Sequence, residues 1–326
     1  MRQMALQIRQ RGMTLMELLV AMALGAVLLL TLTQFYSHAR RAYTMQSEQA
    51  RLQENARLAL TLIGREVRMA GYLGCDAAVT VSTTASAPPD LPTAALALRG
   101  YENGAGWTAP KTVTRVAGSD VLRVIRSSPG RSLLAADMAS TSAALTLTVN
   151  GEGLATNDRL MVSDCVGADL FCASSVSGLT IQHATSCNSS AALSRAYPAG
   201  AQVMAYTQTQ FFIGINPSGR AALYQVAWNG SGLGSAQEWV EGVADLQLRL
   251  GLDTNADGEV DREVAPSAVS NWSQVRRVRV SLLMEGAEPV LDAGQTLEVD
   301  GVARSFSDRK LRQVYRAEIA LRNRLY

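Results

Sequence analysis

Glu17 is the ionisable residue whose position most demands a chemical explanation. It is the only ionisable side chain between Met13 and Thr33, an apolar run that as a helix, at about 1.5 Å per residue, matches the roughly 30 Å core of a bilayer. A carboxylate in hydrocarbon costs about 2.5–3.5 kcal/mol or more, so it needs a compensating cation. The run contains no basic residue. Cleavage after Gly12 would create one, because the new α-amine of Met13 lies at the edge of the apolar segment.

In a helical array of such segments, Glu17 of one subunit can meet the terminal amine of its neighbour, and pairing within one chain over a single helical turn is the other arrangement. An ordinary signal peptide fits poorly, because no small-residue cleavage site follows the apolar run. A plain signal anchor leaves Glu17 unexplained. The basic residues Arg2, Arg9 and Arg11 precede the run, which predicts a cytoplasmic N-terminus and a periplasmic head on a single-pass inner-membrane chain.

A second group of chemistry-bearing residues begins at Asp253. Oxygen-bearing side chains alternate there before Gly258, as at the start of a Ca²⁺ loop. The candidate ligands are Asp253, Asn255, Asp257 and Asp261. The twelfth position is Val264 in place of glutamate, and Glu263 stands one place early. A metal-free acidic turn fits the same residues, so the sequence requires no cofactor and Ca²⁺ is the one candidate.

Four cysteines follow the apolar run, namely Cys75, Cys165, Cys172 and Cys187. An even number in an exported domain predicts two disulfides. The short loop between Cys172 and Cys187 favours that pair and leaves Cys75 with Cys165. Free buried thiols are the alternative.

Catalysis and nucleic-acid binding find little support. The two histidines, His38 and His183, lie far apart, with His183 expected on the surface, and no nucleophile-elbow, phosphate-loop or zinc-protease motif occurs. Once the three leader arginines are removed, 27 basic and 28 acidic residues remain, a formal charge of −1. We therefore expect a protein that is no enzyme and has no nucleic-acid partner.

The element that must position Glu17 is a long helix, predicted from Met13 to about Ala70. Its second half has an apolar stripe at steps of three and four residues, made by Leu52, Ala56, Ala59, Ile63, Val67 and Ala70. The remaining face carries Glu48, Arg51, Glu54, Arg57, Arg65 and Arg68. Gly71 and Gly74 are stop signals. We expect residues 13–33 to lie in the membrane or a filament core and the second half to pack on a head.

The head, residues 75–326, reads as mainly antiparallel β-structure, which makes the whole chain α+β. The predicted strands are 120–126, 144–149, 202–206, 210–215, 222–228, 244–250, 275–283 and 311–321. Asn229-Gly230 predicts a hairpin turn. The expected organisation is a leader at 1–12, a helix at 13–74 and a β-rich head at 75–326.

The leader and the first helical residues resemble the type IV prepilin signal. Arg-Gln-Arg-Gly12 is followed by Met13-Thr-Leu-Met-Glu17, with Met13 where phenylalanine is usual. The resemblance implies that a prepilin peptidase cuts after Gly12, that the Met13 amine is methylated, and that Glu17 is the assembly carboxylate.

A further set of segments resembles the PilW family of minor pilins. The segments are Met69–Cys75, Ala222–Tyr224, Val240–Gln247, Leu252–Asn255, Trp272–Val280 and Leu321–Asn323. The resemblance implies a pilin-like fold and a low-abundance subunit that primes pilus assembly near the tip, with roles in twitching motility and adhesion. Its implied partners are other minor pilins, the major pilin, the inner-membrane assembly platform and a tip adhesin.

Three other interpretations stay open on the sequence. A J-type minor pseudopilin of type II secretion shares the leader and mechanism, and its gene neighbours would distinguish it. A membrane-anchored periplasmic binding protein with a Ca²⁺ site predicts no cleavage after Gly12, and an exported enzyme would require a catalytic cleft.

Overall fold

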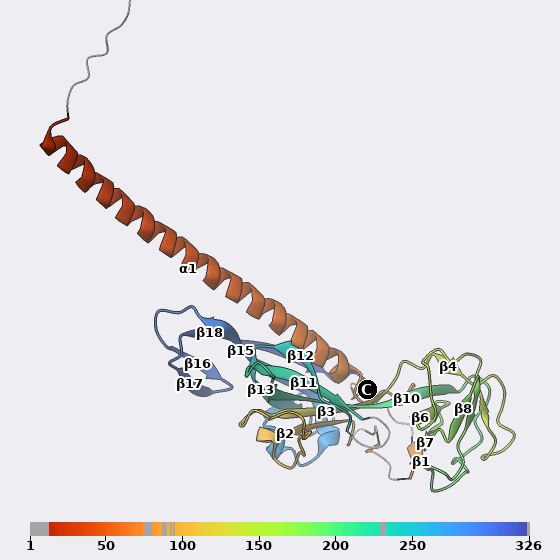
Figure 1. Ribbon diagram of the computed structural model, residues 1–326. Coiled ribbons are helices and arrows are strands. Elements are labelled where there is room, and N and C mark those ends of the chain that lie inside the picture. Colours follow the sequence, from red (N-terminus) through yellow and green to blue (C-terminus); the bar gives the residue numbers. More distant parts are fainter. Residues whose placement is uncertain are drawn as a thin grey trace, which may run out of the picture.

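The computed structural model describes residues 13–74, 80–86, 90–91, 93, 95–228 and 233–324. A single long helix, α1 (Leu15–Arg68), extends from a β-rich head (Figure 1). Its first half projects away from the head, and its second half lies against it. The expected α+β architecture, a long N-terminal helix packed on mainly antiparallel sheets, is confirmed.

The second half of α1 buries the stripe that its sequence predicts. Leu52, Ala56, Ala59, Ile63 and Val67 are all buried, because steps of three and four residues bring them onto one face. Arg51, Glu54, Arg57, Arg65 and Arg68 on the remaining face are exposed.

Glu48 is the exception, since the sequence placed it on the outer face and the structure buries it. Its carboxylate Oε2 accepts a hydrogen bond of 2.9 Å from the backbone N–H of Ala287, and Oε1 lies 3.3 Å from Arg51. Glu48 lies four residues before Leu52, so helical spacing puts it at the edge of the buried stripe, where the head covers it.

The larger sheet contains nine strands in the described part of the chain. They are β1 (Thr80–Thr83), β2 (Leu98–Tyr101), β3 (Val121–Ser127), β4 (Ser132–Leu133), β6 (Arg159–Ser163), β7 (Gly167–Cys172), β10 (Gln202–Ile215), β11 (Ala221–Ala227) and β12 (Gln237–Glu241). The main order is β1-β7-β6-β10-β11-β12, and β10 also pairs with β3 and β4. The β1–β7 pairing is parallel and the others are antiparallel.

A second sheet has the order β14-β13-β15-β18 and is antiparallel throughout. Its strands are β13 (Val243–Leu252), β14 (Arg262–Val264), β15 (Val275–Pro289) and β18 (Lys310–Ala320). The hairpin β16 (Gln295–Val299) and β17 (Val302–Phe306) lies beside it, and β5 (Leu145–Thr146), β8 (Ser175–Ser177) and β9 (Thr180–Gln182) form a small third sheet. The described residues also form four short 3-10 helices: η1 (Glu102–Gly104), η2 (Pro266–Ala268), η3 (Trp272–Gln274) and η4 (Arg322–Arg324).

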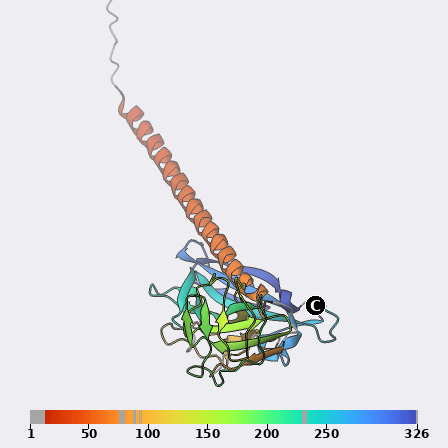
Figure 2. The same cartoon turned by 90° about the vertical axis from the view of Figure 1, so that its right-hand side faces the viewer.

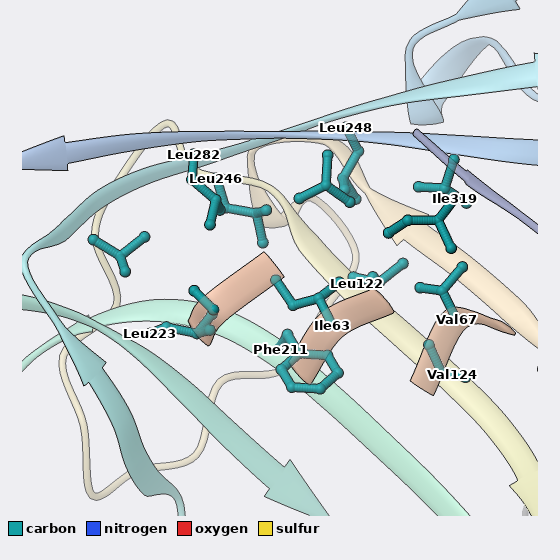
Figure 3. Packing of buried hydrophobic residues seen from close by; sticks show 14 of the residues in the cluster. Ile63, Val67, Leu122, Val124, Phe211, Leu223, Leu246, Leu248, Leu282 and Ile319 are labelled. Atoms are coloured by element: carbon teal, nitrogen blue, oxygen red, sulfur yellow. The ribbon is translucent and has the colours of Figure 1, made fainter. Parts of the chain in front are cut away.

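The principal core forms where α1 meets both of the larger sheets. Ile63 and Val67 of the helix pack in one buried cluster with side chains from each sheet (Figure 3). The labelled members from the sheets are Leu122, Val124, Phe211, Leu223, Leu246, Leu248, Leu282 and Ile319. The second half of the helix is therefore an integral part of the head.

A separate lobe lies at the end of the head farthest from the bare half of α1. We call residues 128–205 the distal lobe; β4 to β9 lie within it, and it has its own buried cluster around Phe171 and Tyr197 (Figures 1 and 2). The long strand β10 joins the two parts, since its first residues pair with β4 and β6 and its later ones with β3 and β11.

The sequence analysis predicted too few strands in the distal lobe. Strands β6 and β7 are buried on both faces, so they show no polar–apolar alternation and were not predicted. The strand predicted at 144–149 is only the two-residue β5, and the runs at 202–206 and 210–215 form one continuous strand, β10. The turn predicted at Asn229-Gly230 lies outside the described residues, although β11 and β12 pair on either side of it.

Asp120 links the two larger sheets, and its raised pKa should make the free energy of unfolding depend on pH. Its carboxylate oxygens accept hydrogen bonds from the backbone N–H groups of Asn103 at 2.8 Å and of Leu248 at 2.9 Å. Burial raises the pKa of Asp120 from 3.8 to about 6, against the opposing effect of those two hydrogen bonds. Below about pH 3 the group is protonated in both the folded and unfolded states. Between pH 4 and 6 the folded state holds the proton more tightly, so stability falls as pH rises.

The expected contribution of Asp120 is at most about 3 kcal/mol, lost between pH 4 and 7. Urea unfolding at several pH values should show the stability of the wild type falling by up to this amount relative to Asp120→Asn, which does not ionise. An NMR titration of the Asp120 carboxyl carbon should have its midpoint near pH 6. A midpoint near 4 would contradict the burial argument.

Candidate functional site

The candidate assembly site lies at the N-terminal end of α1. Thr14 is the N-cap, and its side-chain oxygen accepts a hydrogen bond of 3.3 Å from the backbone N–H of Glu17. In return, Glu17 Oε2 accepts hydrogen bonds from the Thr14 backbone N–H at 2.9 Å and from its hydroxyl at 3.1 Å. This reciprocal arrangement is a capping box. In the single chain, Glu17 therefore satisfies its own helix terminus.

Met13 precedes the cap and is not helical, so the helix starts two residues beyond the predicted cleavage point. Gly12 lies outside the described residues. Cleavage after Gly12, methylation of Met13 and the role of Glu17 in assembly remain predictions.

The half of α1 that bears Glu17 is apolar and uncovered. Among the described residues, α1 is the one helix long and apolar enough to cross a membrane, with a mean hydropathy of 2.4 over its best window, none of which is buried. Exposed side chains there include Leu15, Met16, Leu28, Leu29 and Phe35. A monomeric soluble protein rarely leaves so large an apolar surface exposed. An uncovered apolar surface of this size is typical of a helix that contacts lipid or another protein chain.

Polar contacts fasten the other half of α1 to the head. Glu66 accepts hydrogen bonds from Arg126 on β3 at 2.7 and 3.1 Å, in a two-pronged ion pair that is largely buried. The Asn55 side-chain amide donates to the Glu241 carbonyl at 3.1 Å, and Glu48 holds the N–H of Ala287. The head is thus tied to the helix at several heights, through contacts with both of the larger sheets.

The disulfide predicted between Cys172 and Cys187 is present, with 15 residues separating its ends along the chain. Cys172 ends β7, so the bond fastens the following loop to the distal lobe. The backbone N–H of Cys172 also donates to the Asn188 side chain at 2.7 Å. The other predicted pair joins Cys165 to Cys75, which lies outside the described residues, and that pairing stays a prediction.

Replacing Cys172 and Cys187 together by serine is expected to destabilise the distal lobe by about 3 kcal/mol, from the loop-closure entropy of a 15-residue loop. Hydrogen exchange measured by mass spectrometry should show faster exchange in β6, β7 and β9. Exchange in β13 and β15 should stay unchanged, because those strands belong to the other core. Equal acceleration in both regions would contradict independent lobes.

The acidic run after β13 forms a turn whose carboxylates are already occupied. Asp253 is buried and accepts hydrogen bonds from the N–H groups of Ala256 and Gly258 and from Arg276 Nε at 2.9 Å. Asp261 accepts from the N–H and hydroxyl of Thr254, both at 2.6 Å.

The two middle candidates of this turn interact with each other. Asn255 and Asp257 are linked by hydrogen bonds of 2.9 and 3.1 Å. Over the described residues, no group of three or more His, Cys, Asp or Glu side chains is arranged to hold a metal ion. The carboxylates act here as backbone caps, and Ca²⁺ binding stays an untested prediction.

The histidine expected on the surface is buried, which corrects the sequence interpretation. His183 is 2% exposed, its Nε2 lies 2.8 Å from the Ala143 carbonyl oxygen, and its ring packs edge-on against Phe171. It fills the core of the distal lobe, and the short strand β9 that positions it gave no clear signal in the sequence.

Two family models match the chain. Residues 8–33 match the prokaryotic N-terminal methylation motif, and residues 210–323 match type IV pilus-assembly protein W, abbreviated PilW. The first match covers Met13 and Glu17, and the second covers the C-terminal end of β10 from Gln210 onward and all of β11 to β18. No curated protein and no solved structure matched the chain. The distal lobe lies outside both family matches.

Proposed function

We propose that this chain, which the two family matches support as a type IV pilus minor pilin of the PilW family, assembles through its N-terminal helix into a pilus and helps to prime it. The observation that carries the proposal is the uncovered apolar half of α1 with a single carboxylate, Glu17, on its first turn. Such a helix is suited to bundling with copies of its own kind. The second match is to a family of pilus-assembly proteins, which is not known as a family of enzymes.

The chain is first stored in the inner membrane, with the leader in the cytoplasm and the head in the periplasm. The arginines of the leader favour this orientation. The Cys172–Cys187 disulfide agrees with it, because disulfides persist in oxidising compartments such as the periplasm.

Cleavage after Gly12 by the prepilin peptidase then exposes the Met13 amine. The cut lies before the N-cap Thr14, so it leaves the helix and its cap in place. The Met13 amine of one subunit and Glu17 of its neighbour compensate each other within the apolar filament core, where neither charge is tolerated alone. Glu17 exchanges its capping contacts with Thr14 for this pairing.

The head contacts the other minor pilins and the major pilin, and the inner-membrane assembly platform drives the subunit into the filament. We place the subunit at or near the pilus tip, where a tip adhesin is a further candidate partner and twitching motility and attachment are the expected consequences. The match to the pilus-assembly family over residues 210–323 favours this role over that of a secretion pseudopilin.

N-terminal mass spectrometry of the protein from membranes and from sheared pili tests this proposal. The expected N-terminal peptide starts at a methylated Met13 in both fractions. A chain that still begins at Met1, or one that is absent from sheared pili while other minor pilins are present, would rule the proposal out.

A further inference from the structure

An arginine-rich cavity lies where α1 leaves the head. The cavity has a volume of about 240 Å³ and is lined by Arg40, Arg41 and Thr44 of the helix, by residues 289–292 and by Arg309. The segment between β15 and β16 and the one before β18 meet here, at the part of the head nearest the bare half of α1 (Figure 1). We call this cavity the arginine pocket.

The pocket carries an excess of positive charge. Its three arginines face one carboxylate, Asp292, which lies 3.7 Å from Arg41. That pair is weak, because the side chains are 74% and 98% exposed. Arg40 and Arg309 have no ion pair with any described residue. The lining therefore has a formal charge of +2 and two guanidinium groups available to an anion.

The neighbouring basic residues differ, since their charges are already neutralised. Lys310 pairs with Glu285 at 2.8 Å, and Arg312 pairs with both Asp308 and Glu285 at 2.6 Å. Lys310 and Arg312 thus form ion pairs with described carboxylates, whereas Arg309 does not.

The backbone holds Arg309 in place at the pocket. Its φ of 60° lies in the left-handed region, which is unfavourable for a non-glycine residue, and its carbonyl accepts a hydrogen bond of 2.9 Å from the N–H of Leu291. Strain of this kind persists where the surrounding structure fixes it, often at a binding site.

The position of the pocket along the helix indicates its ligand. Arg40 lies seven residues beyond Thr33, or about 10 Å along the axis, close to the layer of lipid headgroups outside the apolar core. Long arginine side chains can reach toward that layer. A guanidinium group matches a phosphate through two parallel hydrogen bonds.

We propose that the arginine pocket binds the phosphate of an anionic phospholipid headgroup while the chain waits in the membrane. The inference rests on the proposed membrane storage of residues 13–33. The head supplies Arg309 and the helix supplies Arg40 and Arg41, so one headgroup joins both and fixes the head against the bilayer surface. Extraction into the pilus then requires the lipid to leave.

Native mass spectrometry of the mature full-length protein, released from uncharged maltoside micelles, tests the inference. Added phosphatidylglycerol is expected to give one bound lipid, and phosphatidylcholine at the same concentration far less. Arg309→Gln and, separately, Arg40→Gln should each lower phosphatidylglycerol occupancy by about tenfold, since each removes a charge-assisted contact to the phosphate. The matched control is Arg57→Gln, because Arg57 is an exposed arginine on the same helix, far from the pocket.

Three results would overturn the assignment. They are equal binding of the two lipids, an unchanged phosphatidylglycerol signal in both pocket variants, and displacement of the lipid by inorganic phosphate at an equal concentration, which would indicate a site for the free anion. Any of these results would refute the lipid inference. The proposed pilus function would still stand if the protein in sheared pili begins at a methylated Met13. A chain that begins at Met1 refutes the proposed function instead.

Discussion

Replacing Glu17 by alanine is expected to lower the amount of the protein in sheared pili by about tenfold or more. The variant leaves the Met13 amine without a partner in an apolar filament core, and an uncompensated charge there costs about 2.5–3.5 kcal/mol or more, which exceeds the 1.4 kcal/mol equivalent to a tenfold change. Quantitative immunoblotting of the sheared and whole-cell fractions measures the effect.

Processing should be largely intact in the same variant. Thr14 still caps the helix through its hydroxyl contact with the backbone N–H of residue 17, which alanine retains. The start of α1 and the preceding cleavage point therefore keep their structure. Mass spectrometry of the variant should still find a chain beginning at Met13.

Glu54→Ala is the matched control, because Glu54 is an exposed glutamate on the same helix but lies in the half that packs on the head. It should reach wild-type levels in pili. Normal incorporation of Glu17→Ala, or an equal loss in both variants, would refute a specific role for the Glu17 carboxylate.

The second large effect is expected from Ile63→Ala, which should destabilise the folded head by about 2–5 kcal/mol. Ile63 is fully buried at the meeting point of α1 and both sheets (Figure 3), so its truncation leaves a cavity that rigid strands on two sides cannot close. Denaturant unfolding in uncharged micelles measures the change.

Leu58→Ala provides the comparison for that measurement. Leu58 lies less than two turns away on α1 and is 46% exposed, so its truncation should cost less than about 1 kcal/mol. A similar loss in both variants would show that helix propensity, and not burial between the sheets, controls the stability of this region.

Two physical causes account for the missed or misjudged strands of the distal lobe. Strands β6 and β7 are covered on both faces and so lack alternation, whereas β5, β8 and β9 have two or three residues each and show no period at all. The longer strands β11, β13 and β15 have exposed or half-exposed residues between their buried ones, and the sequence predicted all three.

The sequence alone was sufficient for the long N-terminal helix of this protein. The apolar run, the lone Glu17 and the stripe through Ile63 are local patterns with helical spacing, and a helix converts spacing directly into a face. The Cys172–Cys187 pair also followed from the shortness of its loop. These features depend on neighbours along the chain, so they could be predicted without a structure.

Tertiary structure alone decided what lies opposite each face. It buried Glu48 against β15, buried His183 within the distal lobe, and joined Arg309 to Arg40 and Arg41 across most of the chain length. It also paired Asp253 with Arg276, a contact that the spacing of the acidic run does not predict. Contacts between residues so distant in sequence depend on how the sheets pack on the helix, and no local period encodes that packing.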